Sequence, residues 1–257
     1  MSKIRNVTVL VAFLAIVSAC ASTGGKKGQK LSADKLQQIG EKYLSAGETG
    51  LALQYLTQAE KDKPDDPVIH YDLGLAYGAR GLADLSLEHF KKALALKPDY
   101  AEASNALGVL YAEKGQYAEA EAAFNKALAN PFYQTPYYVL YNLGQLDEKR
   151  GLLPAALEKY QQAVKMQPAY ALAYLRMGII EEELGNLPSA MQSYEKALQY
   201  GPNMGEAMLH VGLLRYREGD LKAARDAFAK VVRMNPDSDS AAQARGYLNK
   251  IPAGNDS

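Results

Sequence analysis

The sequence predicts an all-α protein, a right-handed superhelix of six stacked helical hairpins followed by a C-terminal capping helix. Three sets of small residues predict it, because they recur in register at steps of 34, 34, 36, 34 and 34 residues. The first set is Gly40, Gly74, Gly108, Gly144, Gly178 and Gly212. The second set, twelve positions later, is Ala52, Ser86, Ala120, Ala156, Ala190 and Ala224. The third set, seven positions after the first, is Gly47, Gly81, Gly115, Gly151, Gly185 and Gly219.

The first nineteen residues have the pattern of an export signal. Lys3 and Arg5 precede an apolar run from Val7 to Val17, and small residues follow the run. An apolar run of eleven residues is too short to cross a hydrocarbon core of about 30 Å. We therefore expect residues 1–19 to be a lipoprotein-type signal peptide and not a permanent transmembrane helix.

Cys20 is the only cysteine of the chain, which excludes an intrachain disulfide. The segment from Val17 to Cys20 resembles the lipobox of bacterial lipoproteins, which implies that Cys20 is acylated and becomes the first mature residue. The alternative is an ordinary signal peptide cleaved after Ala21. Ala21 is not the aspartate that retains lipoproteins at the inner membrane. We therefore expect the chain in the cell envelope, lipid-anchored at the periplasmic face of the outer membrane.

Residues 20–32 are rich in Gly, Ser and Lys and predict a flexible tether behind the lipid. Six repeats follow, over residues 33–66, 67–100, 101–136, 137–170, 171–204 and 205–238. In each repeat the first glycine and the small residue allow two helices to approach closely, and the second glycine supplies a positive φ where the first helix ends. A large apolar residue lies four positions after the small residue, and a proline closes the second helix. The large residues, called wedge residues below, are Leu56, Phe90, Phe124, Tyr160, Tyr194 and Phe228.

This pattern resembles the tetratricopeptide repeat, as in LGLAYGARG at 73–81 and AEAAFNKALANP at 120–131. The resemblance extends from residue 33 to about residue 238 and implies a solenoid that binds a protein partner in a concave groove. Residues 239–251 show one more amphipathic pattern and predict a helix that caps the last repeat. Residues 252–257 are polar and predict a disordered tail.

The polar residues predict no enzyme. Basic and acidic residues are equal in number, 29 of each, so no net field favours nucleic acid. His70, His89 and His210 occupy different repeat positions and form no metal-binding pair on a helix face. We identify no nucleophile with a base and no cofactor motif, and we expect no catalytic residue, metal, cofactor or small-molecule substrate. Glu181 and Arg215 are expected to form an ion pair between repeats.

The inward-facing positions of the first helices predict a binding groove. They lie three residues before and one residue after the first glycine, and from the second repeat onward most are apolar or aromatic. Such a lining suits an amphipathic helix or an extended peptide, and the alternative is that it only packs neighbouring helices together. Replacing Leu175 and Ile179 by glutamate is expected to abolish binding and to preserve the fold. The candidate groove residues are Tyr71, Leu75, Asn105, Val109, Tyr138, Tyr141, Leu175, Ile179, Leu209 and Leu213.

One irregular step lies between Gly108 and Gly144 and contains NPFYQTPYYVLYNLG at 130–144. A lipidated chain with this insertion between the third and fourth repeats resembles the type IV pilus biogenesis lipoproteins PilF and PilW. That resemblance implies an outer-membrane pilotin whose groove binds a secretin subunit and assists secretin assembly. One alternative is a periplasmic adaptor of the NlpI type that docks peptidoglycan hydrolases or proteases. Another is a subunit of a polysaccharide-export machine.

Overall fold

Helices form all the regular structure of residues 31–252, which are the residues that the computed structural model describes. The predicted signal peptide, Cys20, most of the tether and the tail from residue 253 lie outside the described residues. The first helices of the six repeats are α1 (Ala33–Ser45), α3 (Pro67–Ala79), α5 (Ala101–Glu113), α7 (Pro136–Lys149), α9 (Ala171–Glu183) and α11 (Gly205–Arg217). The second helices are α2 (Thr49–Asp62), α4 (Ala83–Leu96), α6 (Tyr117–Leu128), α8 (Leu153–Met166), α10 (Leu187–Tyr200) and α12 (Leu221–Met234). The last helix is α13 (Asp239–Leu248).

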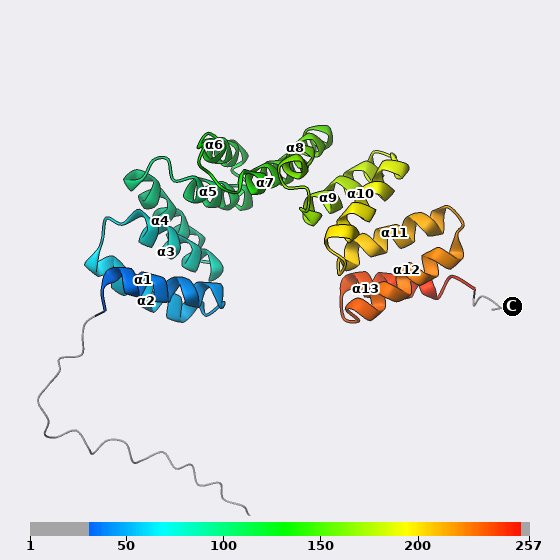
Figure 1. Ribbon diagram of the computed structural model, residues 1–257, viewed down its shortest axis with the longest axis horizontal. Coiled ribbons are helices and arrows are strands. Elements are labelled where there is room, and N and C mark those ends of the chain that lie inside the picture. Colours follow the sequence, from blue (N-terminus) through cyan, green and yellow to red (C-terminus); the bar gives the residue numbers. More distant parts are fainter. Residues whose placement is uncertain (1–30, 253–257) are drawn as a thin grey trace, which may run out of the picture.

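The helix pairs stack side by side into an arch, with α1 and α2 at one end and α13 at the other (Figure 1). The first helices α3, α5, α7 and α9 lie on the inside of the arch, and their partners lie on the outside (Figure 1). Contacts run between consecutive helices and between neighbouring first helices, such as α1 with α3 and α5 with α7. The predicted all-α superhelix of hairpins with a C-terminal helix is confirmed.

The first glycine of each repeat makes room for the wedge residue on the second helix. A Cβ atom added at Gly108 would lie 2.6 Å from Cδ1 and from Cε1 of Phe124. The other five pairs are equally close, at 2.5 or 2.6 Å for the nearest atom. The two helices of a hairpin therefore touch through a ring or a leucine laid directly on glycine backbone.

The second glycine ends the first helix, as predicted. Gly151, for example, has a φ of 74°, and its five counterparts lie between 73° and 82°. The backbone N–H of the following residue, Leu152, donates to the carbonyl of Asp147, which closes the last turn. A left-handed residue at this position is the usual way to satisfy the free carbonyls at a helix C-terminus.

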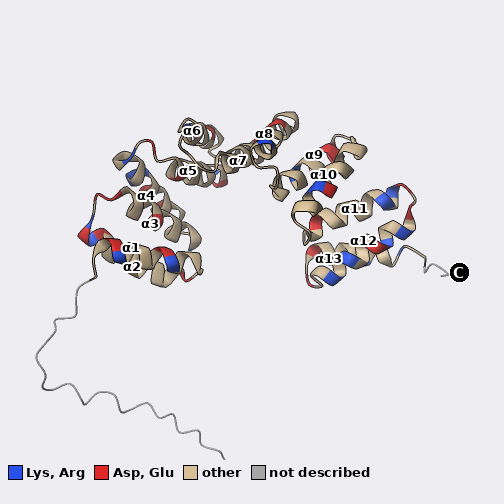
Figure 2. Cartoon of the chain, viewed as in Figure 1, with Lys and Arg blue, Asp and Glu red and all other residues tan. Residues whose placement is uncertain are grey.

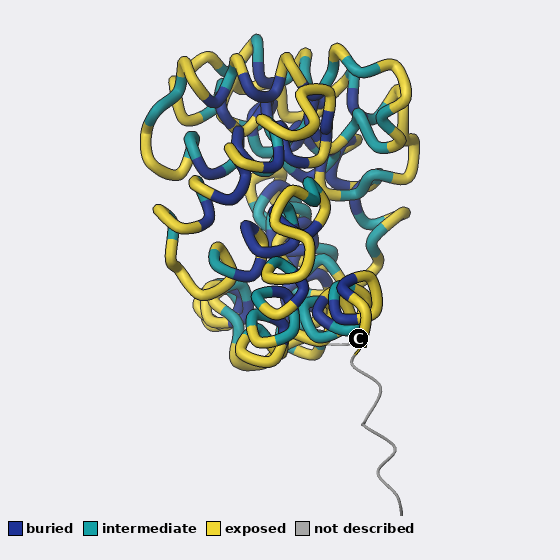
Figure 3. The backbone as a smooth tube through the Cα atoms, turned by 90° about the vertical axis from the view of Figure 1, so that its left-hand side faces the viewer, coloured by how far each residue is buried: buried dark blue, intermediate teal, exposed yellow. Residues whose placement is uncertain are grey.

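The buried residues run along the middle of the stack, between the two helices of each pair (Figure 3). The wedge residues are buried in all six repeats. At the C-terminal end α13 continues this packing. Tyr247 stacks on Phe228, with ring centroids 5.2 Å apart, and Ala241 and Ala244 are fully buried beside it.

Basic and acidic residues are spread over the whole array (Figure 2). Among residues 31–252, none of the helices combines the length and the hydrophobicity that crossing a bilayer requires.

Candidate partner-binding groove

A cavity of about 710 Å³ opens between α3 and α5, the first helices of the second and third repeats. Five of the candidate groove residues line this α3–α5 cavity, namely Tyr71, Leu75, Asn105, Val109 and Tyr138. They come from three successive first helices, because Tyr138 belongs to α7. Four of the five, all except Tyr138, are inward positions of the repeat pattern, and these positions of the second and third repeats therefore converge on one concave space.

The wall that α5 provides follows helical spacing. Glu102, Asn105, Val109 and Glu113 lie at positions i, i+3, i+7 and i+11, so they share one face. Sequence reasoning included the two middle residues and missed the two glutamates. Their spacing from Asn105 and Val109 is the signal that could have identified them.

The irregular segment supplies a further wall, through Tyr133 and Thr135. Asn130 holds this segment in place: its side-chain amide donates to the carbonyl of Asp99 at 2.7 Å, and its side-chain oxygen accepts from the N–H of Phe132 at 2.9 Å. The longer step between repeats thus gives the cavity a wall that the regular steps do not provide.

The chemical character of the α3–α5 cavity is aromatic and apolar with a negative edge. Its described lining contains Glu102 and Glu113 and no lysine or arginine. Burial raises the pKa of Tyr71 to about 12, and burial also raises the pKa of Tyr133. Both phenols therefore keep their protons at neutral pH and can donate hydrogen bonds. A segment with apolar side chains and amide or basic flanks would complement this surface.

Exposure separates the anchoring residues of the cavity from the free ones. Tyr71 is held by Phe90 and Tyr100, with ring centroids 6.0 and 5.1 Å away. Leu75 and Tyr138 keep 37% and 45% of their surface exposed. Of the five candidate residues that line the cavity, these two are the exposed ones and are open to contact with a partner.

The candidate residues of the C-terminal half are placed differently. Tyr141 packs between Tyr160 and Tyr170, with ring centroids 5.4 and 5.2 Å away. Leu175 and Leu209 are only 5% and 4% exposed and belong to core clusters, and Ile179 packs at the edge of one of them. Leu175 and Leu209 therefore mainly pack neighbouring helices together, as in the alternative to a binding groove.

The burial of Leu175 corrects one expectation. A glutamate there would place a charge in the core, so the paired substitution of Leu175 and Ile179 would not preserve the fold. Leu209 and Leu213 do reach a second, smaller cavity of about 340 Å³ that also includes Asp239 and Gln243 of α13.

Equivalent amide contacts join neighbouring first helices. The side-chain amide of Gln37 donates to Asp72 at 2.6 Å, and that of Asn142 donates to Asn105 at 2.9 Å. In both pairs one residue lies three positions before a first glycine and the other lies two positions before the next one. Asn105 therefore lines the α3–α5 cavity and also holds the following repeat.

The predicted Glu181–Arg215 ion pair is not formed. Glu181 is buried and accepts a hydrogen bond from Ser193 at 2.7 Å, while Arg215 pairs with Glu218 at 3.0 Å. The neighbouring Glu182 makes the link between repeats instead. It lies 2.8 Å from Nδ1 of His210 and 2.7 Å from Arg217.

Burial alone would raise the pKa of Glu182, but its contacts lower it overall. Hydrogen bonds from His210 and from Tyr194 outweigh burial, and the charge of Arg217 acts in the same direction. Glu182 therefore stays ionised at neutral pH and holds the fifth and sixth repeats together.

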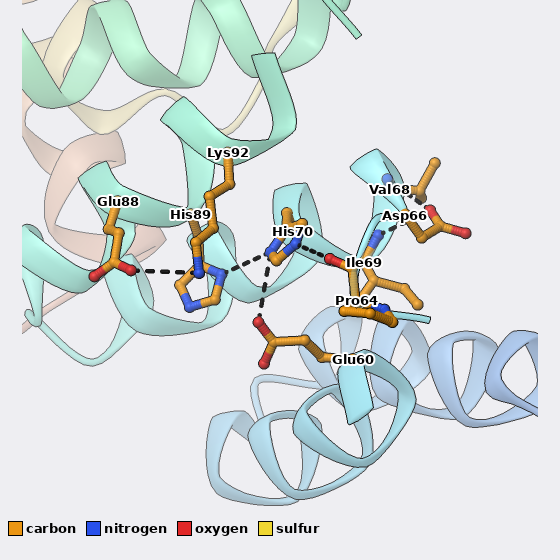
Figure 4. A network of polar contacts seen from close by, with 9 residues as sticks. All are labelled: Glu60, Pro64, Asp66, Val68, Ile69, His70, Glu88, His89 and Lys92. Carbon is orange, nitrogen blue, oxygen red and sulfur yellow. Dashed lines mark hydrogen bonds and ion pairs between the residues drawn. The ribbon is translucent and has the colours of Figure 1, made fainter. Parts of the chain in front are cut away.

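Two of the histidines meet although they share no helix face. Nδ1 of His70 on α3 lies 3.1 Å from Nδ1 of His89 on α4, and Glu60 of α2 lies beside them (Figure 4). These residues are 10 and 19 positions apart along the chain, so helical spacing could not reveal the cluster.

A comparison with known protein families agrees with this architecture. The family model described as "Tetratricopeptide repeat" matches residues 38–99, 71–134, 141–204 and 192–239. No curated protein sequence matches the chain.

Solved structures with a similar fold include two pilus proteins. The crystal structure of PilW, described as a widely conserved type IV pilus biogenesis factor, has a TM-score of 0.75 and 24% identity, covering 83% of this chain and 98% of that one. PilF of Pseudomonas aeruginosa has a TM-score of 0.75 and 22% identity, covering 84% and 97%.

A third similar structure is YrrB, described as a TPR protein with an unusual peptide-binding site. It has a TM-score of 0.55 and 22% identity, covering 74% of this chain and 97% of that one. At these identities the structural matches establish the fold. The family model covers most of the sequence, and the chain belongs to the tetratricopeptide repeat family.

Proposed function

We propose that the chain is a binding scaffold without catalytic chemistry, which holds a segment of a protein partner in the α3–α5 cavity. The observation that carries the proposal is the aromatic and apolar lining that α3, α5 and the irregular segment build together. Protein-binding repeats place their ligands on the concave face in this way.

The shape of the cavity favours a peptide segment. Its α3 wall runs from Tyr71 to Ala79, which is a length of about 12 Å at the rise of an α-helix. An extended strand covers that length with about four residues, and an amphipathic helix covers it with two turns. Leu75 and Tyr138 would contact the apolar side chains of such a segment, and the two glutamates would face its amide or basic groups.

Within this class, we propose a pilotin-type lipoprotein that assists secretin assembly in type IV pilus biogenesis. The similarity in fold to PilW and PilF supports the assignment, since it extends over nearly the whole length of both proteins. The lipobox-like segment that ends at Cys20 is the second support. The lipid would hold the solenoid at the periplasmic face of the outer membrane, and the groove would bind a secretin subunit.

The groove is tested with two matched leucines of the second repeat. Leu75 lines the cavity and is 37% exposed, whereas Leu85 on α4 lies outside it and is 40% exposed. Leu75→Glu should weaken binding to a purified secretin subunit about tenfold or more, equivalent to about 1.4 kcal/mol, and should reduce secretin multimers in cells. Leu85→Glu should change neither. Equal affinity for Leu75→Glu and the wild type, with both folded by circular dichroism, would contradict the proposed groove.

The anchor is tested separately at Cys20. Mass spectrometry of the mature protein should find an acylated N-terminal cysteine, and Cys20→Ser should release the protein from outer-membrane fractions. An unmodified amino terminus on the wild-type protein would contradict the anchor and leave the groove unaffected.

A further inference from the structure

Three side chains from three helices meet where the first repeat packs on the second. They are Glu60 of α2, His70 of α3 and His89 of α4 (Figure 4). The two Nδ1 atoms are 3.1 Å apart, and Oε1 of Glu60 lies 3.7 Å from Nδ1 of His70. All three potential ligand atoms lie within 4.8 Å of one another.

The hydrogen bond made by Nε2 of His70 determines that the ring directs the lone pair of Nδ1 toward the cluster. This Nε2 lies 2.7 Å from the carbonyl oxygen of Pro64, which can only accept, so Nε2 carries a proton and donates it. In the neutral ring, Nδ1 then has a free lone pair and faces both His89 and Glu60. Histidines that bind metals show this arrangement, in which the second N–H donates to a backbone carbonyl and orients the ring.

With both rings neutral and no metal ion bound, the cluster pairs its groups incompletely. His89 can donate one hydrogen bond from Nδ1 to Nδ1 of His70, but the Glu60 carboxylate then faces a nitrogen that has no proton to offer. The two rings are only 3% and 7% exposed, so water can do little to separate these lone pairs. A metal cation between the three atoms would accept an electron pair from each of them.

We propose that Glu60, His70 and His89 bind a divalent transition-metal ion, with Zn²⁺ as the ion that two imidazoles and one carboxylate suit best. Tetrahedral Zn²⁺ places two bound imidazole nitrogens about 3.3 Å apart, close to the separation of the two Nδ1 atoms. Glu60 keeps 28% of its side chain exposed, so it can turn inward and leave the fourth position to water.

The bound ion would act as a staple between the first two repeats. It would join the end of α2 to α3 and α4, at the terminus where α1 and α2 have a neighbouring repeat on one side only. None of the three side chains lines the α3–α5 cavity, so this role does not require the partner proposed to bind there.

The test uses the protein treated with a chelator and then titrated with Zn²⁺ by calorimetry and with Co²⁺ by visible absorption. We expect one ion per chain, the strong absorption of four-coordinate Co²⁺, and a rise in melting temperature on adding Zn²⁺. Glu60→Gln should weaken the affinity about tenfold or more, because it removes the anionic ligand while leaving the metal-free fold unchanged.

Glu88→Gln is the matched control. Glu88 is one residue from His89 on α4, is 57% exposed and pairs with Lys92, so its loss should not change the affinity. The proposal is overturned if the wild-type protein binds no stoichiometric ion. It is also overturned if Glu60→Gln binds the ion as tightly as Glu88→Gln and the wild type do, because Glu60 would then not be a ligand.

Discussion

At the scale of single residues, the first glycine of each repeat tolerates the least change. In α5, the backbone of Gly108 lies directly against the ring of Phe124, and both residues are buried. The ring is wedged between two helices and cannot withdraw without separating them. The same contact occurs in every repeat, so the hairpin depends on it throughout the stack.

We expect Gly108→Ala to destabilise the fold by about 1–3 kcal/mol, since the added methyl overpacks the contact with Phe124. Gly246→Ala is the control, because nothing lies within 4 Å of the Cβ atom it would add to α13. That substitution should stabilise the protein by up to about 1 kcal/mol through helix propensity. Urea denaturation measures both, and a neutral Gly108→Ala would contradict the close contact.

Asp72 is a buried carboxyl group whose ionisation opposes folding. Burial raises its pKa to about 6; the hydrogen bond from Gln37 lowers the pKa in part, and the charges of Glu41 and Asp66 raise it further. In the unfolded chain the pKa is about 3.9. The folded state therefore holds the proton more tightly, and stability is lost as the pH rises from about 4 to about 6.

Asp72→Asn should remove this loss. We expect the variant to be more stable than the wild type by about 1–3 kcal/mol above pH 7, and to lose that advantage near pH 4. Denaturation midpoints measured across this range give the answer. A stability difference that does not depend on pH would show that ionisation of Asp72 is not the cause.

At the scale of helices, the fourth and fifth repeats carry a polar contact that the others lack. Their wedge residues are tyrosines, and each hydroxyl donates to a glutamate twelve residues earlier on the first helix: Tyr160 to Glu148 at 2.5 Å and Tyr194 to Glu182 at 2.9 Å. Each glutamate also contacts a residue of the next repeat that lies two positions before its first glycine: Arg176 contacts Glu148, and His210 contacts Glu182. In the repeats with leucine or phenylalanine wedges, the glutamate position holds Leu44, Gly78, Ala112 or Tyr216. A tyrosine wedge residue therefore occurs only in the repeats that carry a glutamate at this position of the first helix.

A double-mutant cycle tests this pairing. Tyr194→Phe keeps the ring and should cost about 1.5–3 kcal/mol, because it removes a hydrogen bond to a charged group. Combined with Glu182→Ala it should cost less than the sum of the single changes, with a coupling of about 1–3 kcal/mol. Tyr194→Phe combined with the distant Gly246→Ala should be additive. An additive result for Tyr194 and Glu182 as well would mean that the two side chains do not stabilise each other.

At the scale of the whole molecule, each repeat is stabilised by the repeats packed against it. Among the described residues, contacts between hairpins run mainly to adjacent ones, so a change at one end of the arch should affect the hairpins at that end most. At the C-terminal end α13 covers Phe228 and Val231, and Arg225 donates to the carbonyl oxygen of Ile251 at 3.1 Å. The last hairpin therefore depends on α13 more than the distant repeats do.

Ending the chain after residue 238 should speed amide hydrogen exchange in α11 and α12 and leave α3 to α6 unchanged. A chain that ends at Pro252 keeps α13 and should behave as the full protein does. Exchange that rises equally in all helices would indicate one cooperative unit and would contradict local coupling.

The repeat pattern of the sequence by itself determined the order of the hairpins, the glycines where the first helices end and the wedge residues. These features depend on spacing within one hairpin, where helical geometry leaves few alternatives. It also identified inward positions, four of which line the α3–α5 cavity.

Only the tertiary structure decided which inward side chains stay at the surface. The packing of each repeat against the next leaves Leu75 and Tyr138 at a cavity but buries Leu175 in the core. This packing also gives the contact between repeats to Glu182 in place of Glu181, while the packing of α3 on α4 within one hairpin brings His70 and His89 together. Such contacts depend on the angles between neighbouring helices and on side-chain directions from several helices at once, and no spacing within one helix encodes them.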